Sequence, residues 1–333
     1  MQNKLSLKRI LKWPQFSITV ALILLVSIFG TTTPAFLTLG NAVNMARQTA
    51  INLIIAIAAT YIMTLGCIDL SIGSTQCFAC VFAASFIMGG AMNGYGWPIK
   101  MHPVLAIICG LGFAAFVGFI NGLLITKLKL APFLVTLASQ TTFRGLGQVY
   151  TNGYAVSGLP AGVVNLGKGT WFGIPIPAYI ALVLLIIAWL VLEKTKFGRY
   201  MFAIGGNQEC ARLSGIKIDK VKIIVYVISA TLAGIAGMLT GFRMGSAQLT
   251  IGTGTELDAI TAAALGGTVM SGGRSYMLGT FLGCTFLSML SVAFNIAGIN
   301  SYWQQVLKGI ILVLSILISS GSVAFNFKKK KQS

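Results

Sequence analysis

Three polar side chains recur on one face of a predicted helix. Thr136, Gln140 and Arg144 follow one another at intervals of four residues, inside a stretch from about 131 to 148, and this spacing puts them on one helix face. Hydroxyl and amide groups in such a row suit the passage of a neutral, polyhydroxyl solute. The same groups equally suit hydrogen bonding between neighbouring helices, so the sequence leaves both roles open.

A single carboxylate lies between two hydrophobic stretches. Asp69 separates residues 48–66 from 70–90, and a carboxylate at the centre of a bilayer costs roughly 2.5 to 3.5 kcal/mol on insertion scales. Asp69 is therefore expected to face a polar cavity, a helix terminus or the membrane interface. With Ser71 and Ser74 it is a candidate for a substrate pathway, and structural pairing is the alternative.

The sequence contains few residues that could support catalysis, nucleotide binding or metal binding. Gly162–Lys168 has the spacing of a phosphate-binding loop, but Gly169 stands where a Ser or Thr hydroxyl must bind the metal. Cys77 and Cys80 lie in an apolar span, where thiols pack as small hydrophobes. His102 is the only histidine, and the chain has six carboxylates. We expect no catalytic residue, no metal and no cofactor.

The elements that carry these residues are hydrophobic segments. Hydrophobic residues make up 56% of the 333-residue chain, charged residues 9%, and the mean hydropathy is +0.86, which predicts an all-α, polytopic membrane helical bundle of about ten transmembrane helices. The stretches at 131–148 and 256–270 are polar or rich in glycine, so they are expected inside the bundle or broken. The ten segments are 14–31, 48–66, 70–90, 104–126, 131–148, 176–193, 222–242, 256–270, 276–297 and 303–323.

The distribution of Lys and Arg predicts the orientation. With ten spans and both termini in the cytoplasm, 18 of the 24 basic residues fall on the cytoplasmic side, as the positive-inside bias requires. The net charge of +18 is then explained by the Lys and Arg residues of the cytoplasmic loops, and nucleic-acid binding is not expected. The basic start of the chain is read as preceding a retained first helix. Residues 1–333 are predicted to form one transmembrane domain in the lipid bilayer, with a cytoplasmic loop at 194–222.

That loop concentrates charge. Ten of the thirty charged residues lie between 193 and 222. Asn207 is a good N-cap, Glu209 suits the first helical turn, Arg212 the last, and Gly215 the left-handed stop. The helix is too short to be stable alone in water, so either it is a simple connector or it docks on a partner. The docking residues would be Gly206, Asn207, Glu209, Ala211, Arg212, Leu213 and Gly215.

Several motifs resemble those of one transporter family. The stretch from Gly66 to Ser74, the 198–222 loop, Glu256–Ile260 and the glycine-rich 265–274 region look like the permease subunits of ribose-type ABC sugar importers. The resemblance runs from about residue 35 to 320. It implies two permease subunits, identical or related, forming one pore in the bacterial cytoplasmic (inner) membrane. It further implies a cytoplasmic ATPase that supplies energy, an extracytoplasmic sugar-binding protein, and a coupling helix at 207–215.

Other transport classes stay open. The same broad class of permeases also carries nucleosides and branched-chain amino acids. An ion-coupled secondary transporter needs intramembrane ionisable groups, and Asp69 is almost the only internal carboxylate that the sequence offers. A membrane enzyme is the third alternative.

Overall fold

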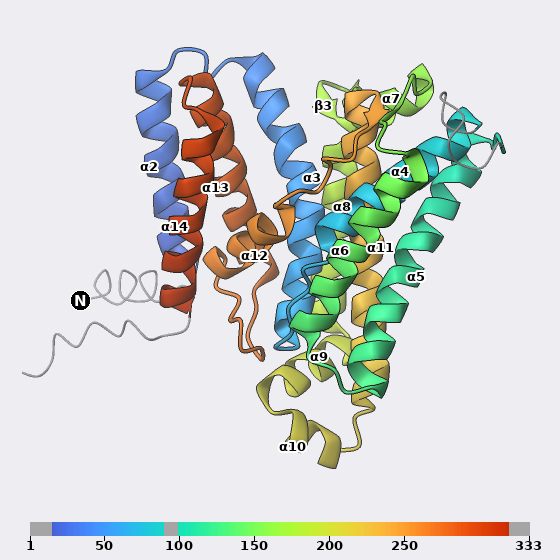
Figure 1. The fold of residues 1–333 in the computed structure, drawn as a ribbon. Coiled ribbons are helices and arrows are strands. Elements are labelled where there is room, and N and C mark those ends of the chain that lie inside the picture. Colours follow the sequence, from blue (N-terminus) through green and yellow to red (C-terminus); the bar gives the residue numbers. More distant parts are fainter. Residues whose placement is uncertain (1–14, 90–98, 320–333) are drawn as a thin grey trace, which may run out of the picture.

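The computed structural model describes residues 15–89 and 99–319, and in these residues it is almost entirely helical (Figure 1). The predicted all-α bundle is confirmed, and each of the ten predicted segments corresponds to a helix. Lys4, Lys8, Arg9, Lys12 and Lys328–Lys331 lie outside the described residues. The ten helices are α2 (Phe16–Thr32), α3 (Leu39–Thr64), α4 (Ile72–Met88), α5 (Pro103–Lys127), α6 (Pro132–Thr151), α8 (Ile176–Lys194), α11 (Ile218–Met244), α12 (Thr255–Leu265), α13 (Met277–Ile296) and α14 (Ser301–Ser319).

Five of these helices, α3, α5, α8, α11 and α13, are long and apolar enough to cross a membrane. Helices α2, α4 and α14 are apolar but offer shorter stretches. Helix α6 is too polar for a typical span, and α12 has only 11 residues. Both segments were expected inside the bundle or broken, and 256–270 agrees, because α12 is mostly buried and ends at Leu265. The expectation is wrong for 131–148, because α6 is an unbroken helix of 20 residues with only six of them buried.

Short elements lie at the two ends of the bundle. Helix α7 (Ala161–Lys168) and two small antiparallel pairs, β1 (Val156–Ser157) with β4 (Ser246–Ala247) and β2 (Thr170–Trp171) with β3 (Ile174–Pro175), form at one end. Helices α9 (Lys196–Gly206) and α10 (Gln208–Leu213) project at the other end (Figure 1). Helices α7 and α9 and the four short strands were not predicted from the sequence.

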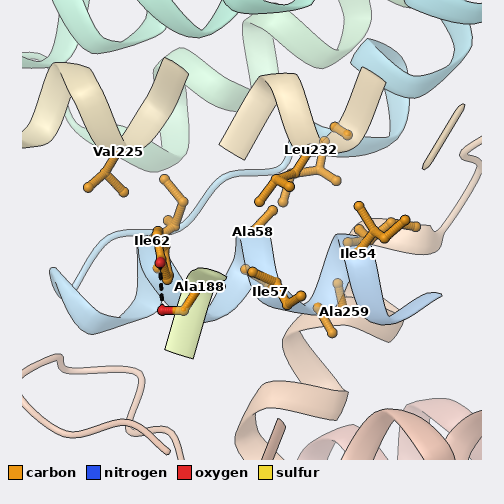
Figure 2. Packing of buried hydrophobic residues seen from close by; sticks show 14 of the residues in the cluster. Ile54, Ile57, Ala58, Ile62, Ala188, Val225, Leu232 and Ala259 are labelled. Carbon is orange, nitrogen blue, oxygen red and sulfur yellow. Dashed lines mark hydrogen bonds between the residues drawn. The ribbon is translucent and has the colours of Figure 1, made fainter. Parts of the chain in front are cut away.

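The centre of the bundle is built on α3 and α11. Helix α11 packs on α3, α4 and α5, while α3 also contacts α8, α12 and α13. Residues of α3 such as Ile54, Ile57 and Ile62 are therefore buried on all sides, and Figure 2 shows them between Val225 and Leu232 of α11 and the neighbouring helices. Lipid is as apolar as a side-chain core, so close packing and interhelical hydrogen bonds hold this centre together.

Glycines permit the closest helix contacts. A Cβ atom on Gly118 would overlap the Tyr226 carbonyl of α11, and one on Gly237 would overlap the Gln76 backbone of α4. The spacing Gly279-x-x-x-Gly283 gives a similar close approach, because both glycines of α13 lie against carbonyl groups of α12 or its C-cap. Helices α2, α13 and α14 form a second group, and α12 and α13 both pack it against α3.

Helix α3 begins nine residues before the predicted segment, at Leu39. Its first turns carry polar side chains that lower the local hydropathy, yet Asn44 and Gln48 find partners inside the protein. The Arg243 guanidinium of α11 donates to Gln48 Oε1 at 2.8 Å and to Asn44 Oδ1 at 3.3 Å. Side-chain pairing thus allows helix where a hydropathy window predicts a loop.

Candidate functional site

Asp69 lies in the turn between α3 and α4, where Gly66 takes a φ of +69°. Only 3% of the residue is exposed. Its Oδ1 accepts hydrogen bonds from the Ser71 amide at 2.9 Å and the Ser71 hydroxyl at 2.6 Å, and its Oδ2 accepts from the Ser229 hydroxyl at 3.1 Å. Of the environments predicted for Asp69, the structure shows the helix terminus, since this carboxylate lies beside the first turn of α4.

Ser71 connects this turn to a further helix. The Asn121 amide of α5 donates to Ser71 Oγ at 3.0 Å, and Ser74, fully buried, donates to the Ser71 carbonyl at 2.9 Å. Asn121 lies six residues before the end of α5 and Ser229 eleven residues after the start of α11. At 1.5 Å per residue, α4 therefore begins roughly 9 to 16 Å inside the bundle.

A second helix also begins inside the bundle. The chain after α11 turns back through Gly252 and Gly254, with φ values of +77° and +76°, before α12 starts at Thr255. A Cβ atom on Gly73 of α4 would overlap both the Gly252 carbonyl and the Glu256 carboxylate. The first turns of α4 and α12 therefore meet in the interior. Helix N-termini carry partial positive charge, so this junction favours anionic or electron-rich groups.

The polar row on α6 points to the same junction. Gln140 Nε2 donates to Glu256 Oε1 at 2.9 Å, while Arg144 Nη1 donates to the Leu249 and Ile251 carbonyls, each at 2.7 Å. Thr136 is fully buried and donates to the Pro132 carbonyl of its own helix at 2.9 Å. Two of the three predicted residues thus bind the chain that leads into α12, and Thr136 does not join them.

Sequence reasoning missed several members of this junction. Gln76 of α4 donates to the Thr255 hydroxyl at 2.7 Å. Glu256 is a second internal carboxylate, only 6% exposed, and its Oε2 has no hydrogen-bond partner within the described residues. Polar side chains inside apolar spans, which drew attention to Asp69, could also have indicated Gln76, Asn121 and Glu256. Spacing alone does not reveal that they converge, because they come from separate helices.

The loop helix α10 has the predicted local structure. Asn207 Oδ1 accepts from the Cys210 amide at 3.0 Å, and Gly215 takes a φ of +81°. Glu209 and Arg212 form an exposed ion pair, with Nε–Oε2 at 3.2 Å. The hydrogen bond from Arg212 and its positive charge hold the pKa of the Glu209 carboxyl below its ordinary value. Ala211 is buried, and Leu213 is 77% exposed although it is apolar.

Helix α9 connects α10 to the body of the bundle. A Cβ atom on Gly205 would overlap the Thr64 carbonyl at the end of α3 and the Gly273 amide in the turn before α13. Gly206 lies beside Gly205 in the same helix, yet a Cβ there would meet nothing within 4 Å. A displacement of α9 would therefore press directly on α3 and on the 266–275 turn.

The remaining sequence motifs have structural positions. Cys77 and Cys80 are fully buried in α4, and His102 caps α5 by accepting from the Val104 amide at 3.4 Å. Gly162–Lys168 falls within helix α7, whereas a phosphate-binding loop would precede a helix. Within residues 15–89 and 99–319, no group of three His, Cys, Asp or Glu side chains could hold a metal ion.

A protein-family profile described as "Branched-chain amino acid transport system / permease component" matches residues 41–316. That range contains the α3–α4 turn, the α12 junction and α10. The chain belongs to this family. It is therefore a permease component and a multi-pass membrane protein, as the five long apolar helices also indicate.

Curated relatives in this family are similar along most of their length. The chain is 42% identical over 301 residues to the ribose import permease protein RbsC of Bacillus subtilis, covering 90% of each chain. It is 36% identical over 307 residues to RbsC of Escherichia coli K12, covering 90% of this chain and 92% of that one. The galactose/methyl galactoside import permease protein MglC of the same strain is 31% identical over 329 residues, covering 96% of this chain and 97% of the relative. No solved structure matches the chain.

Proposed function

We propose that this permease is the membrane subunit of an ATP-driven ABC importer that moves a monosaccharide, ribose or a related small polar solute, across the bacterial cytoplasmic membrane. The observation that carries the proposal is the 42% identity to a ribose import permease over 90% of both chains. Relatives named for galactose transport are more distant, at 31% identity. Residues 1–333 act as one transmembrane domain that hydrolyses no ATP itself.

The importer needs three kinds of partner besides the bilayer. A cytoplasmic ATPase supplies energy, an extracytoplasmic sugar-binding protein delivers the solute, and a second permease subunit, identical or related, completes the pore. Support for the ATPase contact comes from α10, which is well capped but short, projects from the bundle and exposes Leu213. Six helical residues do not hold a helix in water by themselves, so a partner that covers Leu213 would stabilise α10.

The substrate pathway runs past the junction of α4, α6 and α12. Its proposed residues are Asp69, Ser71, Ser74, Thr136, Gln140 and Arg144. Support comes from Gln140 and Arg144, which lie beside two interrupted helices, because transporters commonly place solutes where helices are broken. In this structure these groups are already hydrogen-bonded: Ser71 to Asp69, Gln140 to Glu256, and Arg144 to the Leu249 carbonyl. A solute that passes must exchange some of those hydrogen bonds for its own hydroxyl groups.

An ion-coupled transporter is the second candidate, and Glu256 is the observation that favours it. A buried carboxylate with one unpartnered oxygen is a group that coupling ions use in other transporters. The two candidates differ in their energy source. The test uses proteoliposomes that contain the complete importer, because inverted vesicles cannot present the external binding protein correctly. ATP is supplied on the side of the ATPase, and labelled ribose is supplied on the opposite side.

We expect accumulation of ribose that depends on ATP and persists after ionophores collapse the proton and sodium gradients. A variant of the partner ATPase that binds but does not hydrolyse ATP is the control, and it should abolish accumulation. Uptake that follows an imposed ion gradient without ATP would contradict the importer assignment. ATP-dependent uptake of leucine or a nucleoside in place of ribose would keep the class and change the substrate.

A further inference from the structure

A large basic cavity opens beside α10, where the spans α5 and α11 end. Its volume is about 1090 Å³. It is bordered by the α5–α6 turn, by α10 and by the first turns of α11. Six basic residues and one acidic residue line it: Lys127, Lys129, Arg212, Lys217, Lys220 and Lys222, with Asp219.

Two of the six positive charges in this cavity are paired with carboxylates, and a third basic residue is hydrogen-bonded to a neutral amide. Lys127 pairs with Asp219 at 3.0 Å, Arg212 pairs with Glu209, and the Lys222 ammonium donates to Gln208 Oε1 at 2.8 Å. Lys129, Lys217 and Lys220 have no ion pair within the part of the chain that the structure describes. These three lysines and Lys222, whose partner Gln208 is neutral, repel one another, so an anion there would relieve the repulsion.

An apolar groove adjoins the cavity. Leu130 also lines a second cavity of about 350 Å³ between α5 and α6. That groove runs away from the charged end, along Ile120, Leu124, Leu134 and Val135. A soluble anion would fill the basic part only, whereas a molecule with a charged head and a hydrocarbon tail fits both parts.

We propose that the basic cavity and the adjoining α5–α6 groove bind an anionic phospholipid from the neighbouring membrane leaflet, with the phosphate between Lys129 and Lys220 and an acyl chain along Leu134. The depth supports this source of the phosphate, because Lys127 ends α5 and Ile218 begins α11, and ends of membrane helices lie at the level of lipid headgroups. Basic pockets between membrane helices have the chemistry that recognises such heads. The lipid would join the α5–α6 turn to α10 and so steady the loop helix.

Photo-crosslinking of the full-length chain in nanodiscs tests the site. The nanodiscs contain phosphatidylcholine with a trace of photoactivatable phosphatidylglycerol, and the crosslinked peptides are mapped. We expect adducts in residues 120–135 and 216–224. The double variant Lys129→Gln/Lys220→Gln should lower their yield by roughly fivefold for each lysine removed.

A matched variant controls for net charge. Lys100→Gln/Lys168→Gln removes two exposed lysines at the opposite end of the bundle, and its yield should stay unchanged. Equal yields in the two double variants, or adducts elsewhere only, would overturn the proposal. Displacement of the lipid by inorganic phosphate would instead assign a free-anion site. Unchanged lipid adducts, together with lost ATPase binding in Lys129→Gln/Lys220→Gln, would assign the cavity to protein docking.

Discussion

Glu256 is buried, and one of its carboxylate oxygens has no hydrogen-bond partner among residues 15–89 and 99–319, which is costly inside a bundle. Two features of the junction lower that cost. The carboxylate lies in the first turn of α12, where the helix dipole favours negative charge. Gln140 satisfies the other oxygen, Oε1, from α6. The α6–α12 contact at this point therefore depends on one side-chain hydrogen bond.

Gln140→Leu tests that dependence. The substitution leaves both Glu256 oxygens without a side-chain donor, so we expect the free energy of unfolding to fall by roughly 1 to 3 kcal/mol. In a Glu256→Leu background the same change should cost less, with a coupling of roughly 0.5 to 3 kcal/mol. Thermal melting of the purified permease measures both terms.

The control for this cycle is Gln148→Leu, an exposed glutamine on the same helix, which should leave the melting temperature nearly unchanged. Transport per assembled complex separates pathway from packing. If Gln140→Leu melts earlier but transports normally per complex, Gln140 is structural and the solute passes elsewhere. Lost transport at an unchanged melting temperature would place Gln140 on the pathway and contradict the stability prediction.

At the scale of elements, the connection between α9 and α3 rests on Gly205. An alanine there would push its methyl group into the Thr64 carbonyl, which belongs to backbone and cannot rotate away. We expect Gly205→Ala to cost roughly 1 to 3 kcal/mol, as overpacking usually does, and to weaken the coupling between ATP hydrolysis and transport. Sugar transported per ATP hydrolysed is the measurement.

Gly206→Ala is the matched control for Gly205→Ala. Both glycines lie in α9, but Gly206 faces open space, so its substitution should be neutral or slightly stabilising. If both alanine variants lower the sugar transported per ATP equally, the loss comes from helix propensity or from the loop. The contact between Gly205 and Thr64 would then not transmit the movement of α9.

We expect the ATPase to recognise α10 through its charged side chains. Glu209→Lys and Arg212→Glu each break the surface ion pair and place a wrong charge at a fixed position. We expect both to reduce sugar-stimulated ATP hydrolysis while the permease stays folded. The double variant Glu209→Lys/Arg212→Glu restores an ion pair with exchanged signs, and it should remain defective because the partner meets reversed charges.

An apolar substitution pair completes the test of α10. Leu213→Gln should weaken ATPase binding, whereas Leu128→Gln, at another exposed leucine at the end of α5, should not. If Glu209→Lys/Arg212→Glu restores sugar-stimulated ATP hydrolysis, the ion pair stabilises α10 and the ATPase does not recognise its charges. Normal ATPase stimulation in all of these variants would remove α10 from the docking surface.

The sequence predicted elements well and their convergence poorly. Hydropathy located ten of the helices, and local capping rules placed Asn207 and Gly215 correctly, since both signals lie within one turn of the residue concerned. The meeting of Gly73 with Gly252 depends on how two helices approach each other. Asp69 was recognised as unusual, but its partner Ser229 lies 160 residues away. No local pattern carries that information.

At the scale of the whole molecule, helix ends divide the loops into two groups. The α5–α6 turn, α9 with α10 and the 266–275 turn lie at one end, as the Lys127–Asp219 pair and the Gly205–Gly273 approach require. Helix α7 and the strand pairs lie at the other (Figure 1). The first group contains most of the basic residues predicted on the cytoplasmic side. An intracellular ATPase can reach α10 only if this end faces the cytoplasm.

Site-directed labelling tests this orientation. A cysteine-free background is needed because Cys210 is exposed in α10. In that background, single cysteines at Lys217 and Lys168 report on the two ends. We expect an impermeant thiol reagent added to intact cells to label position 168 and to spare position 217, and permeabilised cells to show labelling at both.

The charge bias makes the reverse orientation unfavourable, since retention of Lys and Arg in the cytoplasm sets the direction of insertion. Labelling of position 217 from outside, with position 168 protected, would invert the bundle. It would also place α10 on the opposite side of the membrane from a cytoplasmic ATPase and so exclude the proposed coupling.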